Sequence, residues 1–206
     1  TEEDRARLTE QFGQPFLIMR NFFKRHACCR ACFEGIEGIR HLLTANALTP
    51  EAVQQVRVTM KPARTWLVAT TDPRDIYQAK FSLPFCMAVT VLRGDAGIFQ
   101  FTEENLRQPS IREFMRKVSL VNDPAIATKA RIEVMERDGT VRTAEPTCRS
   151  MAPEEVKEKF IKNTSAFLDG ELVHSILSAV EHLEEVERIA ELTHLLTHPA
   201  SGRIAA

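Results

Sequence analysis

The sequence has no excess of charge of either sign, since 27 lysine and arginine residues stand against 28 aspartate and glutamate residues. A nucleic-acid-binding protein presents a net basic face to phosphates, so we expect no nucleic-acid partner. No apolar run approaches the roughly 20 residues of a membrane-spanning helix, so we expect no membrane contact. The opening TEEDRARLTEQFGQPF lacks the apolar core of a signal peptide. We therefore expect a cytoplasmic protein whose five cysteines are reduced.

The first half of the chain contains both helical and extended patterns. Apolar residues recur at helical spacing over 34–48, and they alternate with polar residues over 56–60, as in a strand with one covered face. The apolar run 81–92 contains Pro84, which is tolerated in the first turn of a helix. A helix is therefore predicted there, with a buried strand as the alternative.

The middle of the chain predicts a mostly antiparallel sheet. Ser110 and Glu113 have the spacing of a capping box, which would start a helix at Ser110. Asp138-Gly139 is typical of a two-residue hairpin turn. The strands expected around these signals are 118–121, 130–137 and 140–144. Helices combined with a hairpin indicate an α+β fold.

The chain becomes helical after Pro153, which with the two following glutamates suits a helix start. Asp169-Gly170 is expected to end that helix. A further apolar stripe predicts one long amphipathic helix that runs toward Leu196 and stops at Pro199. The stripe consists of Leu172, Ile176, Val180, Leu183, Val186 and Ala190. Such a helix needs an apolar partner surface.

The stretch FFKRHACCRACFEG concentrates thiols and cations. Cys28, Cys29 and Cys32 could begin a zinc site, but such a site usually needs a second pair of ligands, and Cys86 and Cys148 each stand alone in the sequence. We therefore predict no metal and expect small buried thiols with a packing role.

Two other kinds of site have less support in the sequence: a redox pair of cysteines and a metal site with two histidines. A redox pair of Cys29 and Cys32 would need a thioredoxin-like context, which the flanking sequence lacks. His194 and His198 are four residues apart and could share a helix face as metal ligands. Histidines are also common at a helix C-terminus, where they interact well with the helix dipole.

The cations of the same stretch are Lys24, Arg25 and Arg30. The arginine fork fits a carboxylate, and a lysine can act as a point charge or exchange protons. A site for an acidic small molecule is therefore one interpretation, and a solvated basic surface is the other.

Two blocks of the sequence resemble the MmgE/PrpD family. FFKRHACCRACFEGIEGI resembles the segment in which that family has Phe-Lys, then Cys-Cys-Arg and a helix. IYQAKFSLPFCMAVTVLRGDAGIFQFTEENLRQPSIREFMRKVSLVNDP resembles the family's Phe-Ser-Leu-Pro-Tyr block and the helix, glycine turn and strand after it. DGTVRTAEP and PEEVKEKF continue in the family's order, so the resemblance covers nearly the whole chain.

The resemblance implies the C-terminal half of a longer enzyme. Members of the family have an N-terminal helical domain, a smaller α+β lid and a C-terminal segment that returns to the helical domain. Residues 1–21 would then end the helical domain or form a linker, 22–149 would form the lid, and 150–206 would be the returning helices. The expected partners are the missing N-terminal helical half and a second copy, in a homodimer.

The family's reactions make or break bonds beside a carboxylate: 2-methylcitrate is dehydrated, cis-aconitate is decarboxylated, and iminodisuccinate is epimerised. The resemblance implies a dehydratase-type lyase for small polycarboxylates that uses no metal or cofactor, with decarboxylase or isomerase as variants. By resemblance Lys24 is the catalytic lysine, while Arg30 binds a substrate carboxylate or holds the turn. Phe85 takes the place of a tyrosine that borders the substrate, so the phenolic hydroxyl is missing.

A non-catalytic alternative stays open. The chain could be a truncated family member that dimerises or binds a partner through exposed helices. Under both hypotheses we expect the isolated 206-residue chain to be inactive.

Overall fold

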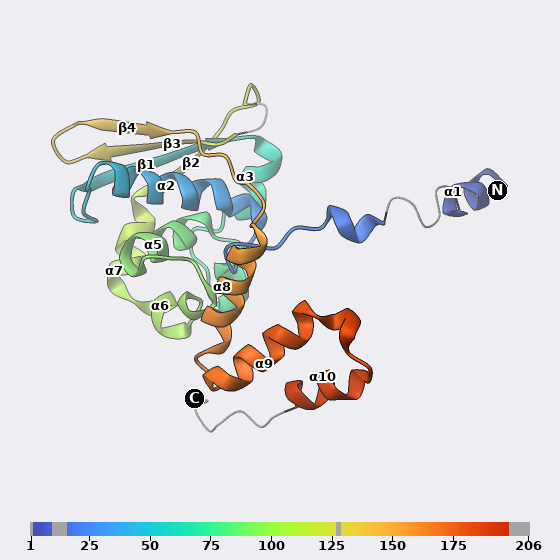
Figure 1. Cartoon of the computed structure of the whole chain (residues 1–206). Coiled ribbons are helices and arrows are strands. Elements are labelled where there is room, and N and C mark those ends of the chain that lie inside the picture. Colours follow the sequence, from blue (N-terminus) through green and yellow to red (C-terminus); the bar gives the residue numbers. More distant parts are fainter. Residues whose placement is uncertain (1, 10–15, 127–128, 198–206) are drawn as a thin grey trace. The chain divides into compact units, whose positions relative to one another are not determined.

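A computed structural model describes residues 2–9, 16–126 and 129–197 (Figure 1). The chain divides into two units. Lys24–Arg149 form one, here called the α+β unit, and the described parts of Thr1–Phe23 and Ser150–Ala206 form the other, here called the helical unit. Among the described residues, every helix is too short or too polar to cross a bilayer.

The α+β unit contains one sheet with the strand order β2-β1-β3-β4. Its strands are β1 (Val53–Met60), β2 (Val118–Asn122), β3 (Arg131–Glu136) and β4 (Val141–Ala144). β1 runs parallel to β2 and antiparallel to β3, and β3 runs antiparallel to β4. The central Val56 lies beside Val118 and Val134, and all three side chains are buried. The mostly antiparallel sheet among helices confirms the predicted α+β fold.

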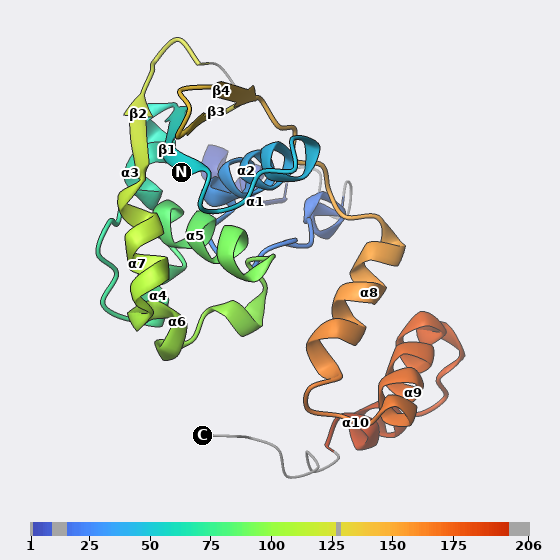
Figure 2. The same ribbon diagram turned by 90° about the vertical axis from the view of Figure 1, so that its left-hand side faces the viewer.

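Helix α2 lies between the sheet and α5 (Figures 1 and 2). The helices of the unit are η2 (Arg30–Cys32), α2 (Phe33–Ala45), α3 (Pro62–Val68), α4 (Ile76–Ala79), α5 (Leu83–Arg93), η3 (Ile98–Gln100), α6 (Glu103–Arg107) and α7 (Pro109–Arg116). Two glycines of α2 permit this close approach. A Cβ atom at Gly38 would lie 2.7 Å from Ile132 Cγ1 of β3, and one at Gly35 would lie 2.7 Å from Leu83 Cδ1 of α5.

The run 81–92 forms a buried helix, as predicted, and not a strand. Ser82 is the N-cap of α5, and its Oγ accepts a hydrogen bond from the Phe85 main-chain N–H over 3.2 Å. Pro84 occupies the first turn, where its missing N–H costs no helical hydrogen bond. Gly94 ends the helix in the left-handed conformation, with φ of 93°.

Two local predictions are wrong in detail: the first residue of one helix and the length of the hairpin loop. Helix α7 starts at Pro109 with Gln108 as its N-cap, so Ser110 lies inside the helix. Proline is preorganised for the first helical position, which moves the start ahead of Ser110. In the hairpin, the Glu136 N–H donates to the Thr140 carbonyl over 2.8 Å, so the loop has three residues and not two. Gly139, with φ of 88°, takes the left-handed position that such a loop requires.

The prediction of one long C-terminal helix is also wrong. The described elements of the helical unit are α1 (Glu2–Thr9), η1 (Leu17–Arg20), α8 (Pro153–Thr164), α9 (Gly170–Glu181), η4 (Leu183–Glu185) and α10 (Ile189–Leu196). Helices α9 and α10 contact each other, so the apolar stripe folds back and partly covers itself. The predicted stop at Pro199 and the ligand candidate His198 lie outside the described residues.

Candidate functional site

The loop Lys24–Cys29, at the start of the α+β unit, is fixed against both ends of α5. The Ala27 N–H donates to the Ala96 carbonyl over 2.9 Å, and the Cys29 N–H donates to the Lys80 carbonyl over 2.8 Å. Lys80 precedes α5 and Ala96 follows it. These two bonds therefore join the two sequence blocks that carry the family resemblance, which lie far apart in the chain.

Lys24 is exposed, and its side chain curls back over its own loop. The Nζ atom donates to the Cys28 carbonyl over 3.3 Å. The hydrogen bond restricts the ammonium group to fewer conformations, while the side chain stays accessible to solvent. Lys24 thus carries a positioned positive charge, as a carboxylate-binding or proton-transferring group requires.

Arg30, at the start of η2, is half-buried and lies against two neighbours. Its Nη2 atom donates to the Cys148 carbonyl over 3.5 Å, and its Cζ atom lies 5.2 Å from the centre of the Phe33 ring. The long hydrogen bond links the loop to the segment after β4. Of the two roles that the resemblance implied for Arg30, these contacts favour holding the turn.

Glu34, in the first turn of α2, is a polar residue that the sequence reasoning missed. One carboxylate oxygen, Oε2, accepts a hydrogen bond from Arg64 Nη1 over 2.8 Å and another from the Ala130 main-chain N–H over 2.8 Å. The residue is only 8% exposed, so both partners are needed to satisfy its charge. Glu34 therefore ties α2 to α3 and to the residue before β3.

His26 and Glu37 form a second missed pair. His26 is 5% exposed, its Nε2 lies 2.7 Å from Glu37 Oε1, and its ring meets the Phe33 ring edge-on with centroids 4.9 Å apart. Burial opposes the charge on Glu37, but hydrogen bonds from His26 and Arg40 outweigh it and lower the pKa of Glu37 to about 2. An ionised carboxylate only accepts, so His26 Nε2 donates. The pair anchors the loop on α2.

The structure brings Cys86 to two of the cysteines in the cation-rich stretch. The sulfur atoms of Cys28, Cys32 and Cys86 all lie within 4.8 Å of one another, and all three residues are buried. Hydrogen bonds from Cys32 and Cys86 lower the pKa of Cys28, whereas burial raises the pKa of Cys86. The interpretation that Cys86 stands alone is therefore wrong, because α5 carries it under the loop.

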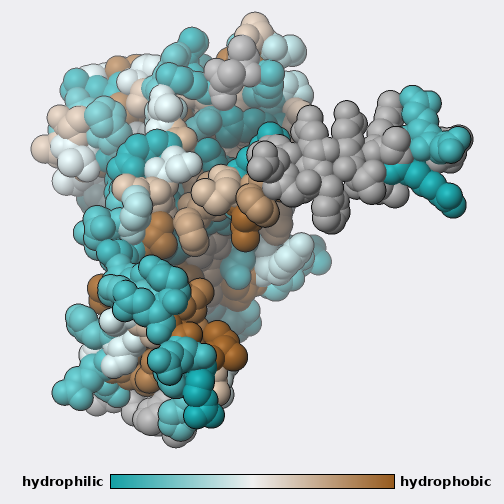
Figure 3. Space-filling view, turned by 45° about the vertical axis from the view of Figure 1, so that its right-hand side comes forward, coloured by the Kyte–Doolittle hydropathy of each residue, from teal (hydrophilic) through white to brown (hydrophobic). Residues whose placement is uncertain are grey.

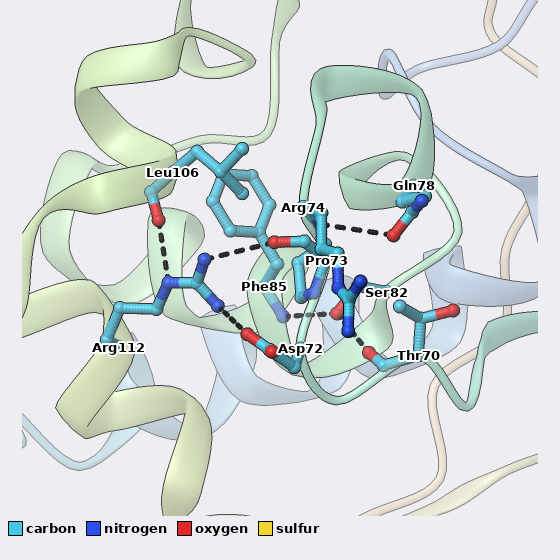
Figure 4. Close-up of polar contacts among 9 residues, drawn as sticks. All are labelled: Thr70, Asp72, Pro73, Arg74, Gln78, Ser82, Phe85, Leu106 and Arg112. Atoms are coloured by element: carbon cyan, nitrogen blue, oxygen red, sulfur yellow. Dashed lines mark hydrogen bonds and ion pairs between the residues drawn. The ribbon is translucent and has the colours of Figure 1, made fainter.

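Phe85 is fully buried. Its ring lies 5.8 Å from that of Phe101, and its main-chain N–H is bonded to Ser82 (Figure 4). Ser82 Oγ in turn donates to the Thr70 carbonyl over 2.5 Å. Within the α+β unit, the Phe85 side chain fills the core, while Lys24 is exposed on the loop and Arg30 is half-buried at the start of η2. Any effect of Phe85 on a substrate would therefore act through the position of α5.

Comparison with known proteins identifies the relatives of this chain. The MmgE/PrpD C-terminal domain matches residues 26–185. The cis-aconitate decarboxylase of Mus musculus is 26% identical over 172 residues, which cover 78% of this chain and 35% of the mouse protein. The cis-aconitate decarboxylase of Homo sapiens is 25% identical over 178 residues, which cover 81% of this chain and 37% of the human protein.

The chain thus spans little more than a third of the length of these relatives. The family match includes most of the α+β unit and the first helices after it. The loop from His26 onward, the α5 block and the hairpin all lie inside the matched range. The chain therefore belongs to the MmgE/PrpD family.

Proposed function

We propose that this chain forms the lid-containing half of a lyase that acts on small polycarboxylates. The observation that carries the proposal is the cation-rich segment from Lys24 to Arg30, which main-chain bonds from Ala27 and Cys29 fix against both ends of α5, in a chain of this family. Breaking a bond beside a carboxylate builds up negative charge, and preorganised cations stabilise that charge in the transition state. A loop held by main-chain hydrogen bonds provides such preorganisation.

Lys24 is the proposed catalytic residue. Its ammonium, held by the Cys28 carbonyl at 3.3 Å, would bind the carboxylate next to the reacting carbon or deliver a proton to that carbon. Arg30 would either bind a second carboxylate or keep the loop in place through Cys148 and Phe33. This mechanism calls on no metal and no organic cofactor.

Two reactions fit the proposal. Loss of water from 2-methylcitrate breaks a carbon–oxygen bond, and loss of carbon dioxide from cis-aconitate breaks a carbon–carbon bond. Both substrates are tricarboxylates, and both reactions need cations over the carboxylates and a proton-transfer group. The two relatives are named for the second reaction, which makes cis-aconitate the first substrate to test.

The proposal includes a larger assembly. The α+β unit would be the lid, the helical unit would return to an N-terminal helical domain, and two copies would form a homodimer. The exposed apolar residues of the helical unit support the proposal that another protein surface covers them in the assembly. They include Phe16, Leu17, Ile18, Met19, Val180, Leu183, Ile189 and Leu196. In Figure 3, hydrophobic residues reach the surface over the C-terminal helices.

The test joins this chain to an N-terminal helical domain of the family and assays the joined protein with cis-aconitate and with 2-methylcitrate. Lys24→Met keeps the aliphatic stem and removes the ammonium, so kcat should fall by about 100-fold or more with the fold intact. Lys61→Met, at another exposed lysine of the same unit, is the matched control and should keep full activity. Full activity of Lys24→Met would remove Lys24 from the site. Failure of the unmodified protein to convert either tricarboxylate would refute the substrate class.

The alternative function is a non-catalytic module that associates through its exposed apolar residues. The same surface residues favour it, since either a missing domain or a separate partner would cover them. The two functions differ in one result: the module would bind its partner but convert no polycarboxylate when joined to the N-terminal half.

A further inference from the structure

Three sulfur atoms from separate parts of the α+β unit meet in its core. Cys28 belongs to the loop, Cys32 to η2 and Cys86 to α5, and their sulfur atoms lie within 4.8 Å of one another. Cys28 is 3% exposed, and the other two are fully buried. Within the described ranges, no further histidine, cysteine, aspartate or glutamate joins this group. The group therefore offers three soft sulfur ligands and, among the described residues, no others.

We propose that Cys28, Cys32 and Cys86 form a three-thiolate binding site for one Cu(I) ion. Thiolates select soft cations. Structural zinc is almost always held by four ligands in a tetrahedron, and iron–sulfur clusters use four cysteines, whereas this group offers three. A soft monovalent ion that accepts three sulfur ligands matches the number, chemical type and burial of the donors.

The surroundings of the three cysteines suit a buried cation–thiolate group. Binding displaces the thiol protons to solvent, and the resulting thiolates need nearby positive charge. The ion itself supplies one such charge, and the Lys24 ammonium on the Cys28 carbonyl supplies another at the edge of the group. The three cysteines belong to the same buried apolar core as Phe33 and Leu83, and such a core excludes water.

The bound ion has a structural consequence for the loop. It joins Cys28 and Cys32 to Cys86 of α5. The Ala27–Ala96 and Cys29–Lys80 main-chain bonds hold the same loop against the residues on either side of that helix. An ion that binds only the folded state raises stability. Because the sulfur atoms are covered, the ion enters when the loop opens locally, so binding is slow compared with diffusion.

The test is an anaerobic titration of the reduced 206-residue chain with Cu(I), in the presence of a chromophoric Cu(I) chelator as competitor. We expect one Cu(I) per chain to resist the competitor and to raise the midpoint of thermal unfolding. Cys86→Ala should lose this uptake, whereas Cys148→Ala, at a half-buried thiol outside the group, should keep it. Uptake that survives Cys86→Ala, or that disappears in Cys148→Ala, would overturn the assignment.

A second measurement needs no variant, in case Cys86→Ala fails to fold. X-ray absorption at the copper edge of the loaded wild-type chain should give a first shell of three sulfur atoms. A shell with nitrogen or oxygen, or with two sulfur atoms, refutes the three-thiolate site. A parallel titration with Zn(II) should give no tightly held ion, and preferential retention of zinc refutes the assignment to Cu(I). Absence of any competitor-resistant metal would leave the three thiols with a packing role only.

Discussion

The Nε2 atom of His26 lies 2.7 Å from Oε1 of Glu37, in a position where only 5% of His26 is exposed. This pair holds the cationic loop on α2, and Arg40 binds the other oxygen of the same carboxylate, Oε2, at 2.5 Å. The loop therefore depends on the charge of one carboxylate, which makes its stability sensitive to pH.

Glu37→Gln should lower stability near neutral pH and have little effect in strong acid. The folded-state pKa of Glu37, about 2, lies below its ordinary value, so the ionised carboxylate contributes stability above about pH 4.5. That contribution is lost as the pH falls from about 4.5 toward 2. Urea unfolding of both proteins at several pH values measures the difference. A difference that stays constant down to pH 2 would contradict the assigned cause.

Gly38→Ala should destabilise the α+β unit more than Gly35→Ala does. The new Cβ at Gly38 would lie 2.7 Å from Cγ1 and 3.2 Å from Cβ of Ile132, which is β-branched and held on a central strand. At Gly35 the new Cβ meets the tip of the Leu83 side chain, which can move more easily. Overpacking costs about 1–3 kcal/mol, partly offset by up to about 1 kcal/mol from the better helix propensity of alanine. Equal unfolding free energies for the two variants would be the contrary result.

Arg112→Met should lower the free energy of unfolding by about 2 kcal/mol, because it removes three hydrogen bonds and leaves carbonyl groups without this donor. Arg112 donates to Asp72 Oδ1 at 2.7 Å, to the Pro73 carbonyl at 3.0 Å and to the Leu106 carbonyl at 2.7 Å (Figure 4). Asp72→Asn is the matched control. The Asp72 side chain is 76% exposed, so its ion pair is worth less than about 1 kcal/mol. An Asp72→Asn cost as large as that of Arg112→Met would assign the stability to the ion pair instead.

The 206-residue chain on its own should convert no polycarboxylate and should self-associate or bind a hydrophobic dye. Phe16, Leu17, Ile18 and Met19 are 67–82% exposed, and burying one such side chain is worth about 1.5–3 kcal/mol. Size-exclusion chromatography, dye fluorescence and turnover assays measure the three properties. Leu17→Glu combined with Met19→Glu should reduce dye binding. A dye-silent monomer that turns over cis-aconitate would refute the proposal that the chain is part of a larger enzyme.

Much of the secondary structure follows from local patterns. The helix of the run 81–92 was predicted because Pro84 is tolerated in a first turn, and the structure adds the Ser82 cap that excludes the alternative of a buried strand. The strand at 56–60 and the hairpin around Gly139 were likewise visible, because alternation and left-handed glycine are properties of neighbouring residues. These local preferences, together with the order of the two family blocks, sufficed for the α+β class and for the family.

The candidate site was only half predictable. The cations Lys24 and Arg30 stand in one short stretch, so the sequence alone singled them out. Several partners that hold this stretch come from elsewhere: the Cys148 carbonyl accepts from Arg30, and the Lys80 and Ala96 carbonyls beside α5 accept from the main chain of the loop. No spacing rule links these positions, because contacts between distant segments depend on how α2 and α5 pack.

Tertiary packing also decided two features that the local sequence pattern did not predict. The apolar stripe that begins at Leu172 keeps a helical spacing, and no glycine or proline interrupts 182–188. The chain nevertheless turns there, and α9 packs on α10. Cys86 looks isolated in the sequence and lies beside Cys28 only because α5 passes under the loop. The sequence by itself determined many of the helices and strands and which residues carry charge. Burial of distant apolar faces against one another decided which of those charges and thiols became neighbours.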